Sequence, residues 1–181
     1  KNNIFLDGNV HGVMEHLTDV NFLKKIMIDG VSVLIVCLDS SELYEDNGFV
    51  DVEMLRAVSR TISKANYDRI ILLIHHPILD TDSDPLFNSR ITIEFVIEHN
   101  IEHIFCGHSH QLSMLKSTDL YHQHSFTQYK SGSLSSADTP NDTNMFMYYK
   151  NFGSEDMEIH IVRAVIENQR LKFKEEIISA N

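Results

Sequence analysis

Four short apolar runs recur at regular intervals along the first part of the chain, and this spacing limits the folds open to it. The runs cover Ile4–Leu6, Val31–Leu38, Ile70–Ile74 and Ile101–Cys106. The second and third are almost continuous in β-branched and aliphatic residues. Such runs favour strands that are covered on both faces, as in a parallel sheet.

Helical periodicity fills the intervals between these runs. The apolar positions predict helices over 13–28 and 50–65, and a third over 89–99. Parallel strands need long crossover connections, so strands that alternate with helices in this way predict βαβ units.

The last third of the chain changes character. Its apolar segments predict strands without intervening helices, over 112–116, 120–126, 145–149, 157–166 and 171–178. Residues 167–170 suit a hairpin connection, and 131–144 has the composition of a loop. We therefore expect one α/β domain over 1–181, with βαβ units first and antiparallel strands at the C-terminal end.

Charge and cysteine content exclude several classes of partner. The 181 residues hold 26 acidic and 15 basic side chains, a formal net charge of -11, which does not favour nucleic acid or an anionic membrane. No apolar run approaches the roughly 20 residues of a membrane span. Cys37 and Cys106 lie in apolar runs and are interpreted as small buried hydrophobes. With no secretory signal visible, we expect a cytoplasmic protein.

Side chains that bind metals or move protons follow each apolar run directly. They are Asn9 and His11 after the first run, Asp39 after the second, His75 after the third, and His108 and His110 after the fourth. Ligands of open α/β sheets lie beyond the carboxyl ends of the strands. We therefore expect these side chains to converge although they are far apart in the sequence.

The Gly-His-Ser-His segment at 107–110 carries the strongest signal. Two imidazoles two residues apart, on a turn that leaves a strand, can each offer a nitrogen to one metal ion or to two neighbouring ions. We expect Gly107 to let the backbone turn tightly beside them. A neutral imidazole suits Zn, Fe, Mn or Ni. For Asp39, a hydrogen bond to a metal-bound histidine and a turn or helix cap remain equal alternatives.

These motifs resemble those of the calcineurin-like metallophosphoesterase superfamily, and most of all its bacterial class III cyclic-nucleotide phosphodiesterases. The matching pieces are Gly8-Asn9 with His11, Leu38-Asp39-Ser40, the spacing from Gly48 to Leu55, Ile74-His75-His76-Pro77, and Cys106 to His110. The resemblance implies a β-sandwich flanked by helices. It also implies a hydrolase of phosphomonoesters or phosphodiesters that uses two metal ions (Mn, Fe or Zn).

The resemblance also implies a role for each matching side chain. Asn9 corresponds to the amide ligand of the second metal, and His75 and His108 complete the nitrogen ligands of that metal. His110 corresponds to a ligand of the first metal. His11 corresponds to the histidine that steers phosphate oxygens or protonates the leaving group.

Two departures from the family pattern leave alternatives open. Val10 separates Asn9 from His11, and Gly12 stands where the family has an acid. The family's Asp-x-His and Gly-Asp-x-x-Asp motifs, which supply two ligands of the first metal and the bridging carboxylate, do not occur in this chain. We expect a preceding N-terminal segment or a partner to complete the site. The alternatives are a non-catalytic scaffold and a mononuclear site held by His75, His108 and His110.

Overall fold

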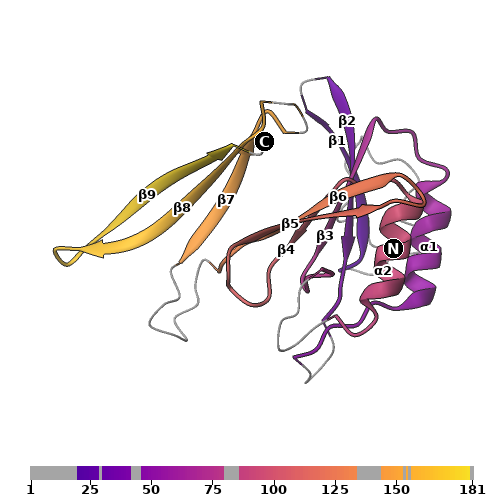
Figure 1. The fold of residues 1–181 in the computed structure, drawn as a ribbon, viewed down its shortest axis with the longest axis horizontal. Helices are drawn as coiled ribbons and strands as arrows, with labels where there is room; N and C mark the ends of the chain where they lie inside the picture. Colours follow the sequence, from indigo (N-terminus) through magenta and orange to yellow (C-terminus); the bar gives the residue numbers. More distant parts are fainter. Residues whose placement is uncertain are drawn as a thin grey trace. The chain divides into compact units, whose positions relative to one another are not determined.

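The computed structural model of the chain describes most of its length (Figure 1). The described residues are 20–28, 30–41, 46–79, 86–133, 144–152, 154 and 156–179. The first apolar run and the candidate residues Asn9 and His11 lie outside the described residues.

Six strands form a mixed sheet in the order β1-β2-β3-β4-β6-β5. Their bounds are β1 Phe22–Ile28, β2 Val31–Leu38, β3 Arg69–Ile74, β4 His103–Cys106, β5 Ser113–Asp119 and β6 His124–Lys130. Strands β2, β3 and β4 run parallel, whereas β1 pairs with β2 in the antiparallel sense. The predicted parallel pairing is confirmed for these three strands, and the α/β class is confirmed with it.

Two helices make the crossovers between the parallel strands and lie next to each other on one side of the sheet (Figure 1). Helix α1, Val52–Ile62, begins after Asp51, whose carboxylate accepts hydrogen bonds from the backbone N–H groups of Glu53 and Met54. An acidic N-cap of this kind satisfies donors that the first helical turn leaves unpaired. Helix α2 spans Ser89–Glu98. Neither described helix has the length and apolar character that a membrane crossing requires.

The hydrophobic core lies between this sheet and the two helices. Along β3, the buried residues Ile70, Leu72 and Ile74 alternate with half-buried ones. These three belong to one buried cluster with residues of both helices, among them Leu55, Val58, Phe95 and Val96. One face of the sheet is therefore core, and the other is only partly covered, in contrast to the predicted full burial of both faces.

The predicted helix over 13–28 is wrong for its described part. Residues Phe22–Ile28 form β1, which pairs with β2 from Phe22↔Cys37 to Ile28↔Val31. The apolar side chains there fit helical spacing, but pairing with a buried neighbouring strand outweighs that local preference. The overlooked signal is the Asp-Gly pair at 29–30, a strong indicator of a two-residue hairpin. Gly30 has the positive φ of 82° that such turns demand.

The C-terminal strands form a second sheet, which is antiparallel and ordered β7-β8-β9. The strands are β7 Met145–Lys150, β8 Glu158–Glu167 and β9 Arg170–Ser179. Asn168 and Gln169 both have positive φ, as a two-residue type I′ hairpin requires, and this confirms the predicted connection. The predicted strand over 120–126 is wrong in its first half, since 120–123 form a turn and β6 begins at His124.

Replacing Gly30 by Ala tests the hairpin at the edge of the six-stranded sheet. The left-handed φ of 82° strains any side chain, so Gly30→Ala should lower the free energy of unfolding by about 1–2 kcal/mol in urea titrations. Gly107→Ala is the control, because the φ of Gly107 is not left-handed and an added Cβ meets no atom within 4 Å. Equal losses in the two variants would contradict this account of the turn.

Candidate metal centre

The carboxyl ends of β2, β3 and β4 lie at one edge of the six-stranded sheet. In the parallel register Leu38 pairs with Ile74, and Leu73 pairs with Phe105. Residues 39, 75 and 107 therefore leave their strands at the same level. Because His108 follows β4 by two residues and His75 follows β3 by one, strand pairing and chain connectivity bring these two histidines to the same edge.

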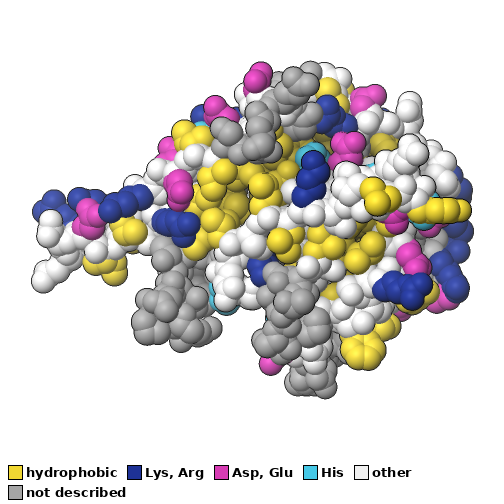
Figure 2. Space-filling view, viewed as in Figure 1, with side chains coloured by type: hydrophobic (Ala, Val, Ile, Leu, Met, Phe, Trp, Pro, Cys, Tyr) yellow, Lys and Arg dark blue, Asp and Glu magenta, His cyan; other side chains and the backbone are white. Residues whose placement is uncertain are grey.

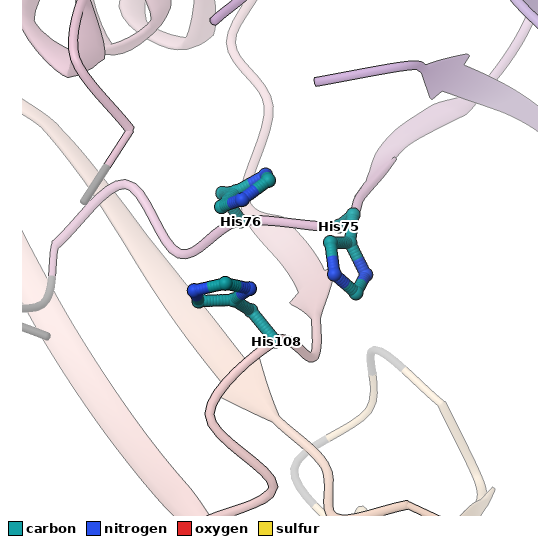
Figure 3. A group of neighbouring side chains, drawn as sticks. All are labelled: His75, His76 and His108. Carbon is teal, nitrogen blue, oxygen red and sulfur yellow. The ribbon is translucent and has the colours of Figure 1, made fainter. Parts of the chain in front are cut away.

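Three histidines at this edge form a group that can hold a metal ion. His75, His76 and His108 each offer one ring nitrogen, and these nitrogens lie within 4.8 Å of one another. Figure 3 shows His75 and His76 on the turn after β3, and His108 on the turn after β4. With metal–nitrogen bonds of about 2.1 Å, two nitrogens on one ion stand at most about 4.2 Å apart. A small movement of the rings therefore suffices for coordination.

His76 differs from the other two histidines because hydrogen bonds occupy both of its ring nitrogens. Its Nε2 lies 2.9 Å from the carbonyl oxygen of Asp46, and its Nδ1 lies 2.9 Å from Ser40 Oγ. A carbonyl oxygen only accepts, so Nε2 carries the proton and Nδ1 accepts from the Ser40 hydroxyl. The side chain is also buried, at 3% exposure. His76 thus fits a structural role, and His75 and His108 are the better metal ligands.

Ser40 and Gly48 hold His76 in place. The Ser40 hydroxyl also accepts a hydrogen bond of 3.1 Å from the backbone N–H of His76, and its carbonyl accepts one of 2.9 Å from Phe49. A Cβ added to Gly48 would lie 2.4 Å from Cγ of the His76 ring. Ser40 and Gly48 belong to segments that resemble the family motifs, and the structure gives both a physical role that the sequence did not reveal. They fix the turn that carries His75.

The turn after β4 is held in an unusual backbone conformation. His108 and His110 both have left-handed φ values, 74° and 56°. A non-glycine residue in this region costs on the order of 1 kcal/mol or more, and such outliers cluster at functional sites. The expectation that Gly107 supplies the tight turn is wrong, since its φ is not left-handed and the histidines themselves make the turn. His110 is not part of the group of three, so its place as a ligand stays a prediction.

The structure does not place the remaining candidate ligands, Asp39, Asn9 and His11, in the group of three histidines. The carboxylate of Asp39 accepts a hydrogen bond of 3.0 Å from the backbone N–H of Ser41, which is the turn-cap alternative. Asn9 and His11 lie outside the described residues. Among the residues that the structure does describe, no acidic side chain joins the three histidines.

The two cysteines, Cys37 and Cys106, lie outside the group of three histidines. Both thiols are free; Cys106 is buried and its Sγ lies 3.6 Å from the carbonyl oxygen of Tyr129. Burial raises the pKa of the Cys37 thiol to about 12, so this group stays protonated at neutral pH. The predicted burial is confirmed for Cys106, whereas Cys37 is only half-buried.

Comparisons with known proteins show similarity in structure only. No family model matches the sequence, and no curated protein matches it. A hypothetical protein from Thermus thermophilus aligns at a TM-score of 0.40 and 11% identity, over 86% of this chain and 61% of that one. Vacuolar Protein Sorting 29 from Cryptosporidium parvum aligns at a TM-score of 0.35 and 12% identity, over 87% of this chain and 56% of that one.

A third solved structure, GAP50, the anchor in the inner membrane complex of Plasmodium, aligns at a TM-score of 0.40 and 12% identity, over 86% of this chain and 53% of that one. The chain thus spans between 53% and 61% of the length of these three proteins. At these scores and identities the likeness carries no conclusion about activity.

Substitution of Gly48 tests whether the turn after β3 depends on close packing against His76. Gly48→Ala places a methyl group inside contact distance of a buried, hydrogen-bonded ring, so the free energy of unfolding should fall by about 1–3 kcal/mol in urea titrations.

Gly107→Ala is the control for this prediction. Its added Cβ meets no atom within 4 Å, and its φ is not left-handed. We expect the smaller loss there. An equal or larger loss in Gly107→Ala would contradict the special role of the Gly48–His76 contact.

Proposed function

We propose that the chain belongs to a metal-dependent hydrolase of phosphomonoesters or phosphodiesters, of the calcineurin-like metallophosphoesterase type. The observation that supports this most is the meeting of His75 and His108 at the carboxyl edge of the parallel strands, where their ring nitrogens lie within 4.8 Å of each other and a small movement of the rings would allow coordination. The proposal extends to the β-sandwich of that superfamily, to cyclic nucleotides as candidate substrates, and to a cytoplasmic setting.

The proposed ligand set follows the sequence motifs and the geometry together. His75 and His108 hold one metal ion with the amide of Asn9, and His110 contributes to a second ion. Imidazole and amide donors suit Mn, Fe or Zn. The carboxylates that the family uses come, in this proposal, from a preceding segment or a partner. When bound, the metals supply Lewis-acid activation of the phosphoryl group and of water.

The residues of the chain prepare this chemistry by orientation. The hydrogen bonds of His76 to Ser40 and Asp46 fix the backbone next to His75, so little freedom is lost when that imidazole binds. The left-handed conformation of His108 directs its ring toward the same edge. His11 is proposed to steer the phosphate oxygens or to protonate the leaving group.

One observation favours a second candidate, a domain with a single metal ion. Such a domain could also be non-catalytic and keep the fold as an interaction scaffold. Within the described ranges, the group contains imidazoles and no carboxylate. A bridging carboxylate normally holds two ions close together, so without one the pair of His75 and His108 suits a single ion. The stoichiometry of metal per chain separates this candidate from the dinuclear hydrolase.

Metal titration of His108→Ala tests the proposal. We expect the wild-type chain to bind Zn²⁺ or Mn²⁺ in isothermal titration calorimetry, and the variant to bind at least about tenfold more weakly because a direct ligand is lost. His122→Ala is the control, since His122 lies in the exposed turn after β5 and pairs with Asp119. Its affinity should equal that of the wild type.

Hydrolysis of an aryl phosphodiester in the presence of the same metals gives the second readout, measured on the chain together with the preceding segment or partner that supplies the carboxylates in this proposal. Turnover that disappears in His108→Ala and persists in His122→Ala supports the hydrolase. Metal binding without turnover supports the scaffold candidate instead. Unchanged metal affinity in His108→Ala would refute the centre itself.

A further inference from the structure

Strand β9 forms one edge of the three-stranded sheet. It is ten residues long, Arg170–Ser179, and among the described strands it pairs only with β8, in the order β7-β8-β9. Every residue from 171 to 178 is exposed. A long exposed edge strand offers unpaired backbone groups to another strand, and natural proteins usually cover or block such an edge.

One face of β9 carries exposed apolar side chains. The β8 register places Leu171, Phe173 and Ile177 on the same face, where they are 62%, 65% and 57% exposed. Phe146 on β7 and Ile166 on β8 share this face and are exposed as well. Apolar side chains that gather on one face of a sheet indicate a surface that is covered by a partner.

The charges of β9 are divided between its two halves. Arg170, Lys172 and Lys174 occupy the first half, and Glu175 and Glu176 follow in the second. Figure 2 shows basic, acidic and hydrophobic side chains together over β8 and β9. A strand that is basic at one end and acidic at the other is complementary to a second copy of itself in the antiparallel orientation. Another protein would have to carry the reverse pattern by coincidence.

The backbone is compatible with this pairing. In a two-residue hairpin, the two residues that close the loop hydrogen-bond to each other through their backbone groups. Here these residues are Glu167 and Arg170. Alternation along β9 then turns the N–H and C=O groups of 171, 173, 175 and 177 toward the open edge. These groups are available to a neighbouring antiparallel strand.

We propose that β9 pairs antiparallel with β9 of a second copy of this chain, about a two-fold axis at Glu175, and so joins the two three-stranded sheets. In this register Lys174 lies opposite Glu176 of the second copy, and Phe173 lies opposite its Ile177. Both pairs occur twice because of the symmetry. Oppositely charged pairs and aromatic–β-branched pairs are the cross-strand combinations that stabilise sheets.

The existing ion pairs of β9 leave its charges accessible for this role. Lys172 and Lys174 both contact Glu167, and Arg163 lies 3.8 Å from Glu176. The β9 side chains Lys172, Lys174 and Glu176 are 52%, 61% and 60% exposed, so such pairs hold them weakly. The two Glu175 carboxylates meet at the axis, a like-charge contact that weakens the pairing and that the hydrogen bonds of each carboxylate with the Tyr148 hydroxyl and Nδ1 of His160 partly offset.

Charge reversal tests both the dimer and its register. The wild-type 181-residue chain should show a monomer–dimer equilibrium in sedimentation velocity. Lys174→Glu turns two attractive pairs into two repulsive ones and should raise the dissociation constant about tenfold or more. Lys174→Glu combined with Glu176→Lys restores both pairs and should return the constant to near the wild-type value.

Lys172→Glu is the matched control for Lys174→Glu. Both lysines contact Glu167 and both are exposed, but in the proposed register Lys172 faces Ile178 of the second copy rather than a charge. The dissociation constant of the Lys172→Glu dimer should therefore change much less than that of the Lys174→Glu dimer. A wild-type chain that stays monomeric throughout the micromolar range would overturn the proposal, as would a double variant no better than Lys174→Glu.

A cysteine at the two-fold axis gives an independent test if a charge variant fails to fold. Paired residues in antiparallel strands have Cα atoms about 5.5 Å apart, within the range of a disulfide. Glu175→Cys should therefore form a covalent dimer under mild oxidation. Lys172→Cys, which lies off the axis, should not. Equal cross-linking of the two variants would contradict the register.

Discussion

The parallel pairing of β3 with β4 is the interaction on which the candidate centre depends. It sets the two strands in register from Ile71↔His103 to Leu73↔Phe105, so that the turns carrying His75 and His108 start at the same level. The alternating burial of Ile70, Leu72 and Ile74 against the helices holds this register, since a shift by one residue would expose the core face. Core packing and site geometry are thus determined by the same strands.

The adjacent residues His75 and His76 have different roles, one as a candidate metal ligand and the other as a structural anchor. His76 is buried, and its ring nitrogens are occupied by Ser40 and by the carbonyl of Asp46. His75, one residue earlier, is exposed at the sheet edge. The chain bends directly after β3, and this bend leaves the His75 side chain exposed beside the buried ring of His76, with ring nitrogens of the two within 4.8 Å of each other. Precise placement of a ligand needs such support from a neighbouring rigid contact.

Much of this organisation could be predicted from the sequence, because long buried strands and amphipathic helices leave strong periodic signals. The strands around Val31–Leu38 and Ile70–Ile74 and both described helices are examples. The helix prediction is wrong for Phe22–Ile28 because their apolar spacing also fits a helix, and only the Asp-Gly pair indicates the hairpin. The contact between Gly48 and His76 left no local signal, since it joins segments that only the fold brings together.

X-ray absorption spectroscopy of the zinc-loaded chain tests the central claim most directly, because it reports the atoms bound to the ion. If the pairing of β3 with β4 builds the centre, the spectrum should show at least two imidazole ligands at about 2.0–2.1 Å, and His75→Ala should remove one of them. A first shell of oxygen atoms alone, or a spectrum unchanged in that variant, would contradict the account.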